Sequence, residues 1–380
     1  MEITHLRLKN WRNFPAADVA ISRRTFVYGP NASGKTNFLD ALRFLRDIAR
    51  PGGGIRGAVD DRGGFAAIRS LHAHGTKQHI ELAIEALDGS TKWKYELHLS
   101  SEGTGAKRVP VVLTEVVHKN GREVDRRPTS DDVSDPARLR ETHLESLRSN
   151  QKYRELAEGL AAIEYMHLVP HVVKYPERAP RSESNGMGGH LLAEIAGTPK
   201  KRRESLLRKV NKGLAIALPE FADLEFEVDE AGMPRLKAKY MHWRKEGSWQ
   251  REDQFSDGTL RLIALLWKLA DDRNKSVLLL EEPELSLHSD LVRQLPRIFS
   301  SIAGRGRQVI FSSHADELLE DDGIEPSEIV LLEPAQGTQV RLASDDHDVV
   351  AVAKAGGKIA PLVVAKTRPK NAGLLATFGQ

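Results

Sequence analysis

A run of glycines with one lysine and one threonine stands near the start of the chain, where residues 29–36 read GPNASGKT. It fits the pattern G-x-x-x-x-G-K-[ST], in which backbone N–H groups cradle phosphates, the lysine reaches the β- and γ-phosphates and the hydroxyl ligates Mg²⁺. The bare pattern also occurs by chance in glycine-rich turns. Here an apolar stretch precedes it and a helical pattern follows it, so Lys35 and Thr36 are predicted to bind a nucleotide.

Two acidic residues end an apolar run much farther along the chain. Residues 277–282 read VLLLEE, which is typical of a buried strand with carboxylates at its C-terminal edge. A hydrolytic site needs a metal holder and a water-activating base there, and Glu281 and Glu282 stand in these two positions. Asp is more usual than Glu281, and the extra methylene leaves open a direct or a water-mediated contact with Mg²⁺. The alternative is an acidic helix start at residues 281–285, EEPEL.

Two further polar stretches could face a phosphate. Residues 255–258, FSDG, stand directly before an amphipathic helical pattern and offer a hydroxyl and free backbone N–H groups. The alternative is an ordinary helix N-cap. His314 ends the buried, strand-like run QVIFSSH, where a single histidine is more often structural.

The elements that must position these residues alternate between strands and helices. Strand signals lie in residues 2–28 and 79–118, the latter as an antiparallel meander, and again in 224–240. The runs that end at Glu282 and His314 are typical of parallel strands with functional C-terminal edges. The glycine-rich residues 51–64 are predicted to form a mobile loop. We divide the chain into residues 1–134, a helical insertion at 135–220, and residues 221–380.

The composition excludes several classes of protein. The 380 residues are 40% hydrophobic and 29% charged, which is typical of a soluble globular protein. No apolar run approaches the roughly 20 residues of a membrane-spanning helix, and no signal peptide is recognisable. The chain contains 0 Cys, which excludes disulfides and thiolate metal sites, and the expected location is the cytoplasm.

Two other polar segments have simpler explanations. The basic run at residues 199–212 is more often a solvated helix face than a nucleic-acid contact, and the net charge of +3 decides little. Residues 72–79, HAHGTKQH, suggest a metal site, but they lack a well-spaced third partner and are predicted to be a surface loop.

Taken in order, these motifs resemble those of ABC-class ATPases of the RecF, SMC and OLD type, and more closely their short stand-alone AAA relatives. GPNASGKT corresponds to Walker A, FSDGT to the signature, LLLEEPE to Walker B, LSLHSD to the D-loop and SSH to the switch histidine. The resemblance implies an α/β fold, an ABC-type P-loop head with a mixed sheet and an antiparallel subdomain. It also implies ATP and Mg²⁺ as cofactors, Glu282 and His314 as catalytic residues, and Thr36 and Glu281 as metal ligands. The nucleotide-binding residues that it implies are Asn31, Ala32, Ser33, Gly34, Lys35, Thr36, Asn37, Ser256, Asp257 and Gly258.

The same resemblance implies a head-to-tail homodimer in which Ser256, Asp257 and Gly258 of one subunit cap the ATP of the other. Gln78 is a weak candidate for the Q-loop. After His314 about 65 residues follow, on the order of half a typical domain, so we expect any nuclease or other effector to be a separate protein. The role expected by analogy is anti-phage defence or DNA repair, with nucleic acid as a further partner. The alternatives are a RecF-like DNA-binding mediator without an effector and the nucleotide-binding subunit of a transporter.

Overall fold

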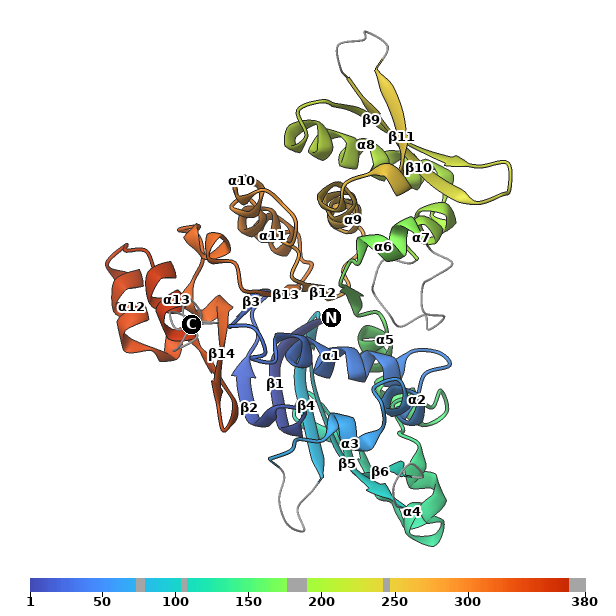
Figure 1. The fold of residues 1–380 in the computed structure, drawn as a ribbon. Helices are drawn as coiled ribbons and strands as arrows, with labels where there is room; N and C mark the ends of the chain where they lie inside the picture. The colour runs from blue at the N-terminus through green and yellow to red at the C-terminus, as the bar shows by residue number, and fades with distance from the viewer. Residues whose placement is uncertain (73–78, 104–107, 176–189, 242–246, 369–380) are drawn as a thin grey trace, which may run out of the picture.

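Three sheets form the framework of the protein (Figure 1). The computed structural model describes residues 1–72, 79–103, 108–175, 190–241 and 247–368. The first sheet has six strands in the order β2-β1-β4-β5-β6-β7, all paired antiparallel. Its strands are β1 (Glu2–Trp11), β2 (Phe14–Ala20), β4 (Ile80–Asp88), β5 (Thr91–Glu102), β6 (Val109–Lys119) and β7 (Arg122–Arg127). The predicted meander is confirmed.

The second sheet carries the sequence motifs and has the order β15-β14-β3-β13-β12-β8. Its strands are β3 (Arg24–Tyr28), β8 (Glu164–Met166), β12 (Leu278–Glu281), β13 (Val309–Ser313), β14 (Ile329–Ala335) and β15 (Gly337–Leu342). All neighbours pair in parallel except β14 and β15, which are antiparallel. The sheet is therefore mixed, which confirms the predicted fold class.

Helices cover both faces of this second sheet. Alternate residues of each strand point to opposite faces, so Val27, Leu279 and Ile310 pack with the helix α1 (Lys35–Ala49) and the first sheet. Phe26, Leu280 and Phe311 pack in a separate core with α9 (Asp257–Ala270) and α11 (Leu295–Gly304). Figure 1 shows α1 below the edge-on sheet and the other two helices above it. The sheet is thus buried on both sides, as its apolar runs predicted.

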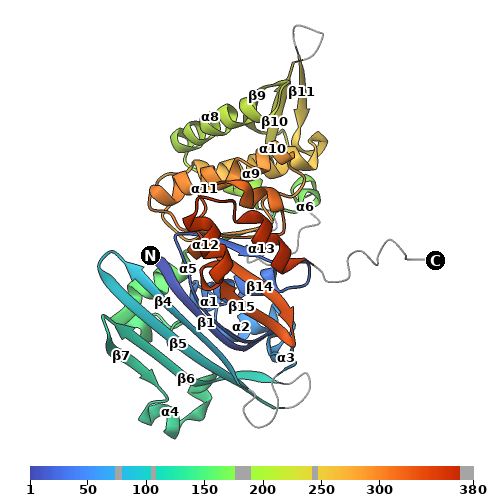
Figure 2. The same ribbon diagram turned by 90° about the vertical axis from the view of Figure 1, so that its left-hand side faces the viewer.

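A third, smaller sheet lies at the far end of the molecule from the first sheet (Figure 2). Its order is β11-β10-β9, with strands β9 (Phe221–Val228), β10 (Pro234–Tyr240) and β11 (Ser248–Arg251). The helix α8 (Lys200–Ala217) packs between this sheet and α9. The remaining helices are α2 (Ile55–Asp60), α3 (Phe65–Ile68), α4 (Ser130–Ser134), α5 (Arg154–Ala161), α6 (Pro170–Lys174), α7 (Leu191–Gly197), α10 (Ser289–Val292), α12 (His347–Lys354) and α13 (Ala360–Thr367).

Two ranges contain elements that the sequence patterns did not predict. Residues 51–64 were predicted to form a mobile loop, but they contain α2, whose Ile55 and Val59 are buried. The Glu145 carboxylate accepts a hydrogen bond from the Ile55 N–H at 2.9 Å, which fixes the start of this helix. The range 135–220, predicted to be helical, also contains the strand β8. The division into three domains stays a prediction.

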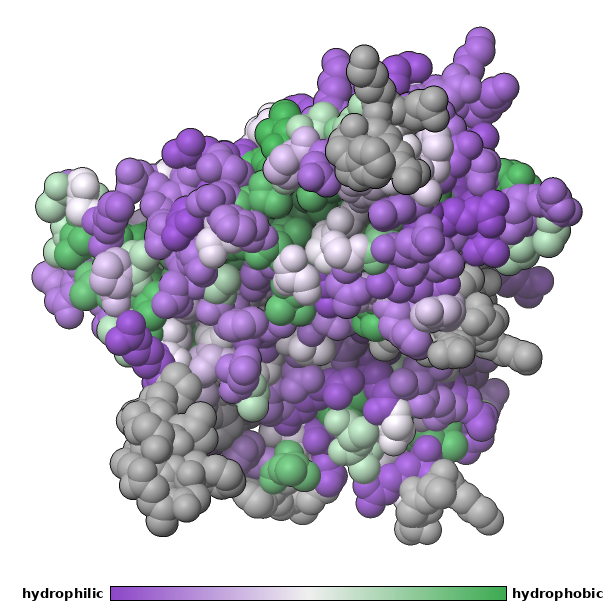
Figure 3. Space-filling view, turned by 45° about the horizontal axis from the view of Figure 1, so that its top comes forward, coloured by the Kyte–Doolittle hydropathy of each residue, from purple (hydrophilic) through white to green (hydrophobic). Residues whose placement is uncertain are grey.

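The surface of the molecule is mostly polar. In Figure 3, hydrophilic residues cover most of the visible face and hydrophobic ones gather in smaller areas between them. Among the described residues, no helix has the combination of length and apolar character that crossing a membrane requires.

Candidate nucleotide site

The glycine-rich run forms a loop between β3 and α1. Ala32 and Gly34 have φ angles of 63° and 95°, in the left-handed region that lets the loop turn tightly. A Cβ on Gly29 would lie 2.6 Å from Ser33 Oγ, and one on Gly34 would lie 2.0 Å from Asn13 Nδ2, so both positions require glycine. No side chain caps α1, and its first turn contains no acidic residue. Its N-terminal N–H groups are therefore available to an anion.

Lys35 lies at the centre of the loop. Its Nζ donates to the carbonyl oxygens of Gly29 at 2.9 Å and Pro30 at 3.2 Å, and it lies 3.8 Å from Glu282 Oε1. Burial lowers the pKa of Lys35, although the carboxylates of Glu282 and Glu284 oppose this shift. A buried ammonium held by carbonyl groups at the start of a helix is suited to bind a polyphosphate.

Glu281 lies between the loop and the edge strand β8. Thr36 Oγ1 donates to one carboxylate oxygen of Glu281, and the Tyr165 hydroxyl donates to the other at 2.5 Å. The Arg43 guanidinium lies 4.6 Å from the centre of the Tyr165 ring. Burial and the neighbouring Glu281 raise the pKa of Tyr165, which keeps its hydroxyl protonated as a donor. A hydroxyl and a carboxylate in contact are oxygen ligands of the kind that Mg²⁺ prefers.

Glu282 and His314 follow the C-terminal ends of the adjacent parallel strands β12 and β13. His314 Nδ1 lies 3.1 Å from Glu282 Oε1, and the Glu282 N–H donates to the Ser312 carbonyl oxygen at 3.1 Å. Glu282 has a φ of 44°, an uncommon conformation for a non-glycine residue. Both side chains are partly exposed at this edge. The pair therefore combines a carboxylate base with a histidine that can orient it.

Glu284 is a buried carboxyl group beside this pair. It accepts a hydrogen bond from Ser313 Oγ through one oxygen, while its Oε2 has no partner among the described residues. Burial raises the pKa of Glu284. Glu284 is thus more buried than the neighbouring Glu281 and Glu282.

The first sheet and β15 support the loop from behind. Asn13 Nδ2 donates to the Ser33 carbonyl oxygen at 3.0 Å, and Thr338 Oγ1 donates to the same oxygen at 2.8 Å. Asn37 Nδ2 donates to Asn13 Oδ1 at 2.7 Å. Asn37 thus faces the supporting side of the loop. Arg12 does not turn toward the loop, because its guanidinium binds the buried Asp40 of α1 at 2.7 Å.

The residues fit a nucleotide with Mg²⁺. The Ser33 side chain is fully buried, and its Oγ has no hydrogen-bond partner among the described residues. Asn31, Ala32 and Thr36 are exposed along the same loop. A pocket of about 270 Å³ opens beside it, with walls from Tyr28, Gly29, Pro30, Asn31, His314, Asp316 and α13.

The signature residues begin α9, on the other face of the sheet from α1. Ser256 is the N-cap of this helix, and its Oγ accepts a hydrogen bond from the Thr259 N–H at 3.1 Å. Asp257 is exposed and accepts a hydrogen bond from Lys174 Nζ at 3.0 Å. A Cβ on Gly258 would lie 2.4 Å from the Ser286 carbonyl oxygen, in the stretch that resembles the D-loop. The signature therefore packs against the stretch that resembles the D-loop. Within one chain, Ser256 is not among the residues that contact Lys35.

Sequence reasoning missed two residues of the site. Tyr165 comes from a three-residue strand inside a helical pattern, and Thr338 lies 305 residues from Ser33, so neither carried a local signal. The roles assigned to the site residues stay predictions. Gln78 lies outside the described residues.

A mostly parallel sheet with this loop after β3, two acids at the C-terminal end of β12 and a histidine after β13 defines an ABC-type P-loop ATPase head. The chain belongs to the family described as "AAA domain, putative AbiEii toxin, Type IV TA system", which matches residues 24–320.

Curated relatives share short segments with the chain. It is 43% identical over 84 residues to the endonuclease GajA of Bacillus cereus, which is 22% of this chain and 13% of that protein. It is 29% identical over 140 residues to the DNA replication and repair protein RecF of Agrobacterium fabrum, which is 37% of this chain and 32% of that protein. RecF of Chloroflexus aggregans is 46% identical over 52 residues, 13% of either chain. The chain thus spans well under half the length of these relatives.

Solved structures show the same fold. An Smc head bound to the C-terminal winged-helix domain of ScpA matches with a TM-score of 0.55 at 16% identity, over 90% of this chain and 98% of that one. An Smc head with an extended coiled coil, bound to the C-terminal domain of ScpA and derived from Pyrococcus furiosus, matches with a TM-score of 0.53 at 13% identity. That match covers 93% of this chain and 99% of the other. The predicted resemblance is confirmed.

Proposed function

We propose that the protein binds and hydrolyses ATP and uses the nucleotide to control its own dimerisation. The observation that carries this proposal is the convergence of Lys35, Glu281 and Glu282 at one edge of the sheet, with Thr36 and His314 in contact with the two acids. ABC-type ATPase heads carry out this chemistry, and these residues supply its phosphate-binding, metal-binding and base groups.

Each residue has one task in the proposed reaction. Lys35 and the loop N–H groups bind the phosphates, and Glu282 accepts the proton of the attacking water. His314 orients the Glu282 carboxylate and would contact the terminal phosphate of a bound nucleotide. Thr36 and Glu281 would hold Mg²⁺, which neutralises charge that develops on the phosphates.

The test uses the purified full chain and MgATP. We expect ATP to bind, phosphate to be released, and the protein to dimerise more strongly with ATP than with ADP. Binding is measured by calorimetry, phosphate release by a coupled assay, and mass by light scattering. ATP binding without any phosphate release would contradict the hydrolytic part of the proposal.

The proposed dimer is a head-to-tail sandwich, with ATP of one subunit capped by Ser256, Asp257 and Gly258 of the other. Support comes from the exposure of Ser256 and Asp257 at the N-terminus of α9, where a helix attracts anions. We further propose a separate effector protein as partner. The match to RecF, a DNA replication and repair protein, supports a role in DNA repair, and the match to the endonuclease GajA supports a nuclease-like effector. Anti-phage defence is the alternative role that we propose. Co-purification from the native host would identify the partner.

A second candidate function is DNA binding in the manner of a repair mediator, which the matches to RecF favour. The basic helix α8 is the element to test. Arg202 and Lys209 are already paired with Asp271 and Asp272 of the same chain, so part of their charge is neutralised at the surface. The exposed basic residues that remain on α8 are Lys200, Lys201, Arg208 and Lys212.

Replacing these four residues by Ala is expected to lower DNA affinity similarly for all sequences, if α8 contacts phosphates. The slope of log affinity against log salt should flatten by up to about 0.9 per lost contact. Fluorescence anisotropy at several salt concentrations measures the DNA affinity and its dependence on salt. The control replaces four exposed basic residues of other elements, Arg56, Lys92, Arg122 and Lys152. Equal slopes for the two variants would show that α8 is only a solvated face.

Tyr165→Phe is expected to raise the Mg²⁺ concentration needed for half-maximal phosphate release by about tenfold. The variant removes the hydroxyl that donates to Glu281, and hydrogen bonds to charged groups contribute about 1.5–3 kcal/mol. ATP affinity without Mg²⁺ should stay unchanged. The matched control is Tyr153→Phe, which removes a hydroxyl bound to Asp125 at 3.2 Å in another part of the protein. Identical Mg²⁺ dependence in both variants would exclude Tyr165 as a positioning residue.

A further inference from the structure

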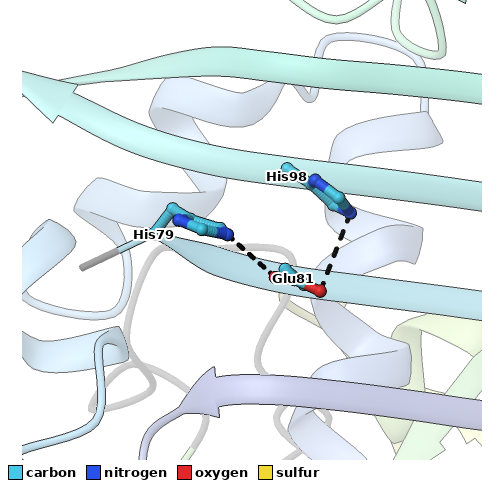
Figure 4. Close-up of side chains that lie close together, drawn as sticks. All are labelled: His79, Glu81 and His98. Atoms are coloured by element: carbon cyan, nitrogen blue, oxygen red, sulfur yellow. Dashed lines mark hydrogen bonds and ion pairs between the residues drawn. The ribbon is translucent and has the colours of Figure 1, made fainter. Parts of the chain in front are cut away.

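Two histidines and one glutamate meet on the outer face of the first sheet (Figure 4). His79 directly precedes β4, Glu81 lies two residues later on the same face, and His98 of β5 stands opposite Glu81 in the strand register. His79 Nε2 lies 2.8 Å from Glu81 Oε1, and His98 Nε2 lies 3.9 Å from Glu81 Oε2. One ligand atom of each residue lies within 4.8 Å of the others.

The cluster corrects the interpretation of residues 72–79 as lacking a third partner. The partners of His79 are Glu81, two residues later, and His98. His98 lies on the neighbouring strand β5, so spacing along the chain could not reveal it. The two imidazole rings stack with a centroid separation of 5.9 Å and an interplanar angle of 29°. The Nε2 atoms of the two rings face different oxygens of the Glu81 carboxylate.

All three side chains are partly buried and lie close enough together to share one ion. Burial lowers the pKa of His98, which favours the neutral imidazole that ligates metals. Burial opposes ionisation of Glu81, but hydrogen bonds from Lys9 and His79 outweigh it and lower its pKa. The exposed fractions of the three side chains are 20–26%, so an ion can enter from solvent without opening the core.

We propose that His79, Glu81 and His98 form a binding site for a divalent transition-metal ion of the Zn²⁺ type. Ligand atoms around a tetrahedral Zn²⁺ stand about 3.4 Å apart, given metal–ligand distances of about 2.0–2.2 Å. The His79–Glu81 and His98–Glu81 separations of 2.8 and 3.9 Å lie on either side of this value, although they involve different carboxylate oxygens, so binding an ion requires rotations of the side chains. Two imidazoles and one carboxylate select Zn²⁺, Ni²⁺ or Cu²⁺ rather than Mg²⁺. The site is therefore chemically distinct from that of the nucleotide.

Lys9 is the natural competitor of the metal. Its Nζ donates to Glu81 Oε1 at 2.7 Å, so the ammonium occupies the oxygen that faces His79. A bound cation repels this ammonium and must displace it. Removal of the Lys9 ammonium should therefore strengthen metal binding. Removal of any of the three ligands should weaken it.

The ion would crosslink the neighbouring strands β4 and β5. It would join β5 to the start of β4, where the His79 carbonyl oxygen also accepts a hydrogen bond from Asn10 Nδ2 of β1 at 2.9 Å. Because the folded state alone brings the three ligands together, the ion should raise the unfolding temperature in proportion to the logarithm of its concentration.

The experiment titrates untagged, chelator-treated full chain with ZnCl₂ in the absence of nucleotide, using calorimetry and thermal unfolding. We expect one strong site per chain and a rise in unfolding temperature. His98→Gln and Glu81→Gln should each weaken binding at least tenfold, since even second-shell changes cost 10- to 100-fold at metal sites. Lys9→Met should tighten it severalfold. With Co²⁺, the unsubstituted chain should give the visible absorption of a tetrahedral site.

Two controls make the result specific. His5→Gln removes a histidine of the same outer face that is paired with the single carboxylate of Asp18, and it should leave Zn²⁺ affinity unchanged. Lys35→Ala should leave it unchanged too, because the nucleotide loop is not involved. Equal Zn²⁺ affinity in the wild type, His98→Gln and His5→Gln would overturn the proposal. If His98→Gln does not fold, an affinity that Lys9→Met leaves unchanged or weakens would overturn it as well.

Discussion

Glu282→Gln is expected to slow phosphate release by about a hundredfold to ten-thousandfold while ATP still binds. The amide keeps the shape of the side chain but cannot accept the proton of the attacking water, and general bases contribute factors of this size. Its carbonyl oxygen can still accept a hydrogen bond from His314, which lies 3.1 Å from Glu282 Oε1 in the unsubstituted chain. The local conformation should therefore survive, and ATP should hold the variant as a dimer.

Single-turnover phosphate release and light scattering with ATP measure the two effects. The matched control is Glu317→Gln, the same chemical change on a partly exposed side chain just after β13, and it should hydrolyse ATP normally. Wild-type turnover by Glu282→Gln would remove this residue from the mechanism. A variant that hydrolyses slowly but stays monomeric with ATP would separate hydrolysis from the proposed dimer.

Mixing two inactive variants should restore activity if the ATP sites are shared between subunits. Lys35→Ala damages the phosphate loop and Ser256→Arg damages the capping surface, so homodimers of either variant should be inactive. In a mixed dimer, one composite site inherits both lesions and the other inherits neither. With random exchange about half of the dimers are mixed, and roughly a quarter of all sites are rebuilt. Phosphate release after subunit exchange measures the recovery.

The structure supplies a control in which the same procedure should fail. Lys35 and Glu282 lie 3.8 Å apart within one chain, so they serve the same half of a composite site. Mixing Lys35→Ala with Glu282→Gln therefore leaves a lesion in every site and should restore nothing. Ser256→Arg also removes a helix N-cap, worth about 0.5–2 kcal/mol, so its unfolding temperature must be checked. Equal recovery, or none, in both mixtures despite verified exchange would contradict the head-to-tail dimer.

The loop after β3 and the acids at the C-terminal end of β12 were predictable because their chemistry depends on contiguous residues. Lys35 and Thr36 follow a glycine pattern, and Glu281 and Glu282 end an apolar run, so local sequence locates both. The parallel order of the strands then brings their C-terminal ends together. This part of the site required no knowledge of distant contacts.

The residues that escaped prediction act through tertiary contacts. Tyr165 reaches Glu281 only because β8 pairs with β12, and three residues are too few for a periodic pattern. His98 reaches Glu81 through the register of β4 and β5, which depends on the turn between them. The glycines of residues 51–64 indicated a loop, but this range contains the helix α2. The start of α2 is fixed by the Glu145 carboxylate, which lies 90 residues away from Ile55 in the sequence. Sequence patterns report local preferences. They could not predict the contacts of Tyr165 and His98 or the start of α2, because each depends on a residue that is distant in the sequence.

The strand order around β3 has a consequence for how the protein is made. β3 precedes the nucleotide loop, yet both of its neighbours, β13 and β14, come from residues beyond 300. During synthesis the loop leaves the ribosome long before the strands β13 and β14 that flank β3. The hydrogen bond from Thr338 to the Ser33 carbonyl oxygen can form only after residue 338 has been synthesised. The antiparallel sheet, built mostly of sequence neighbours, can form first. A nascent chain should therefore acquire nucleotide affinity only after β13 and β14 have been synthesised, and until then the apolar strand β3 lacks its partners and is prone to aggregate.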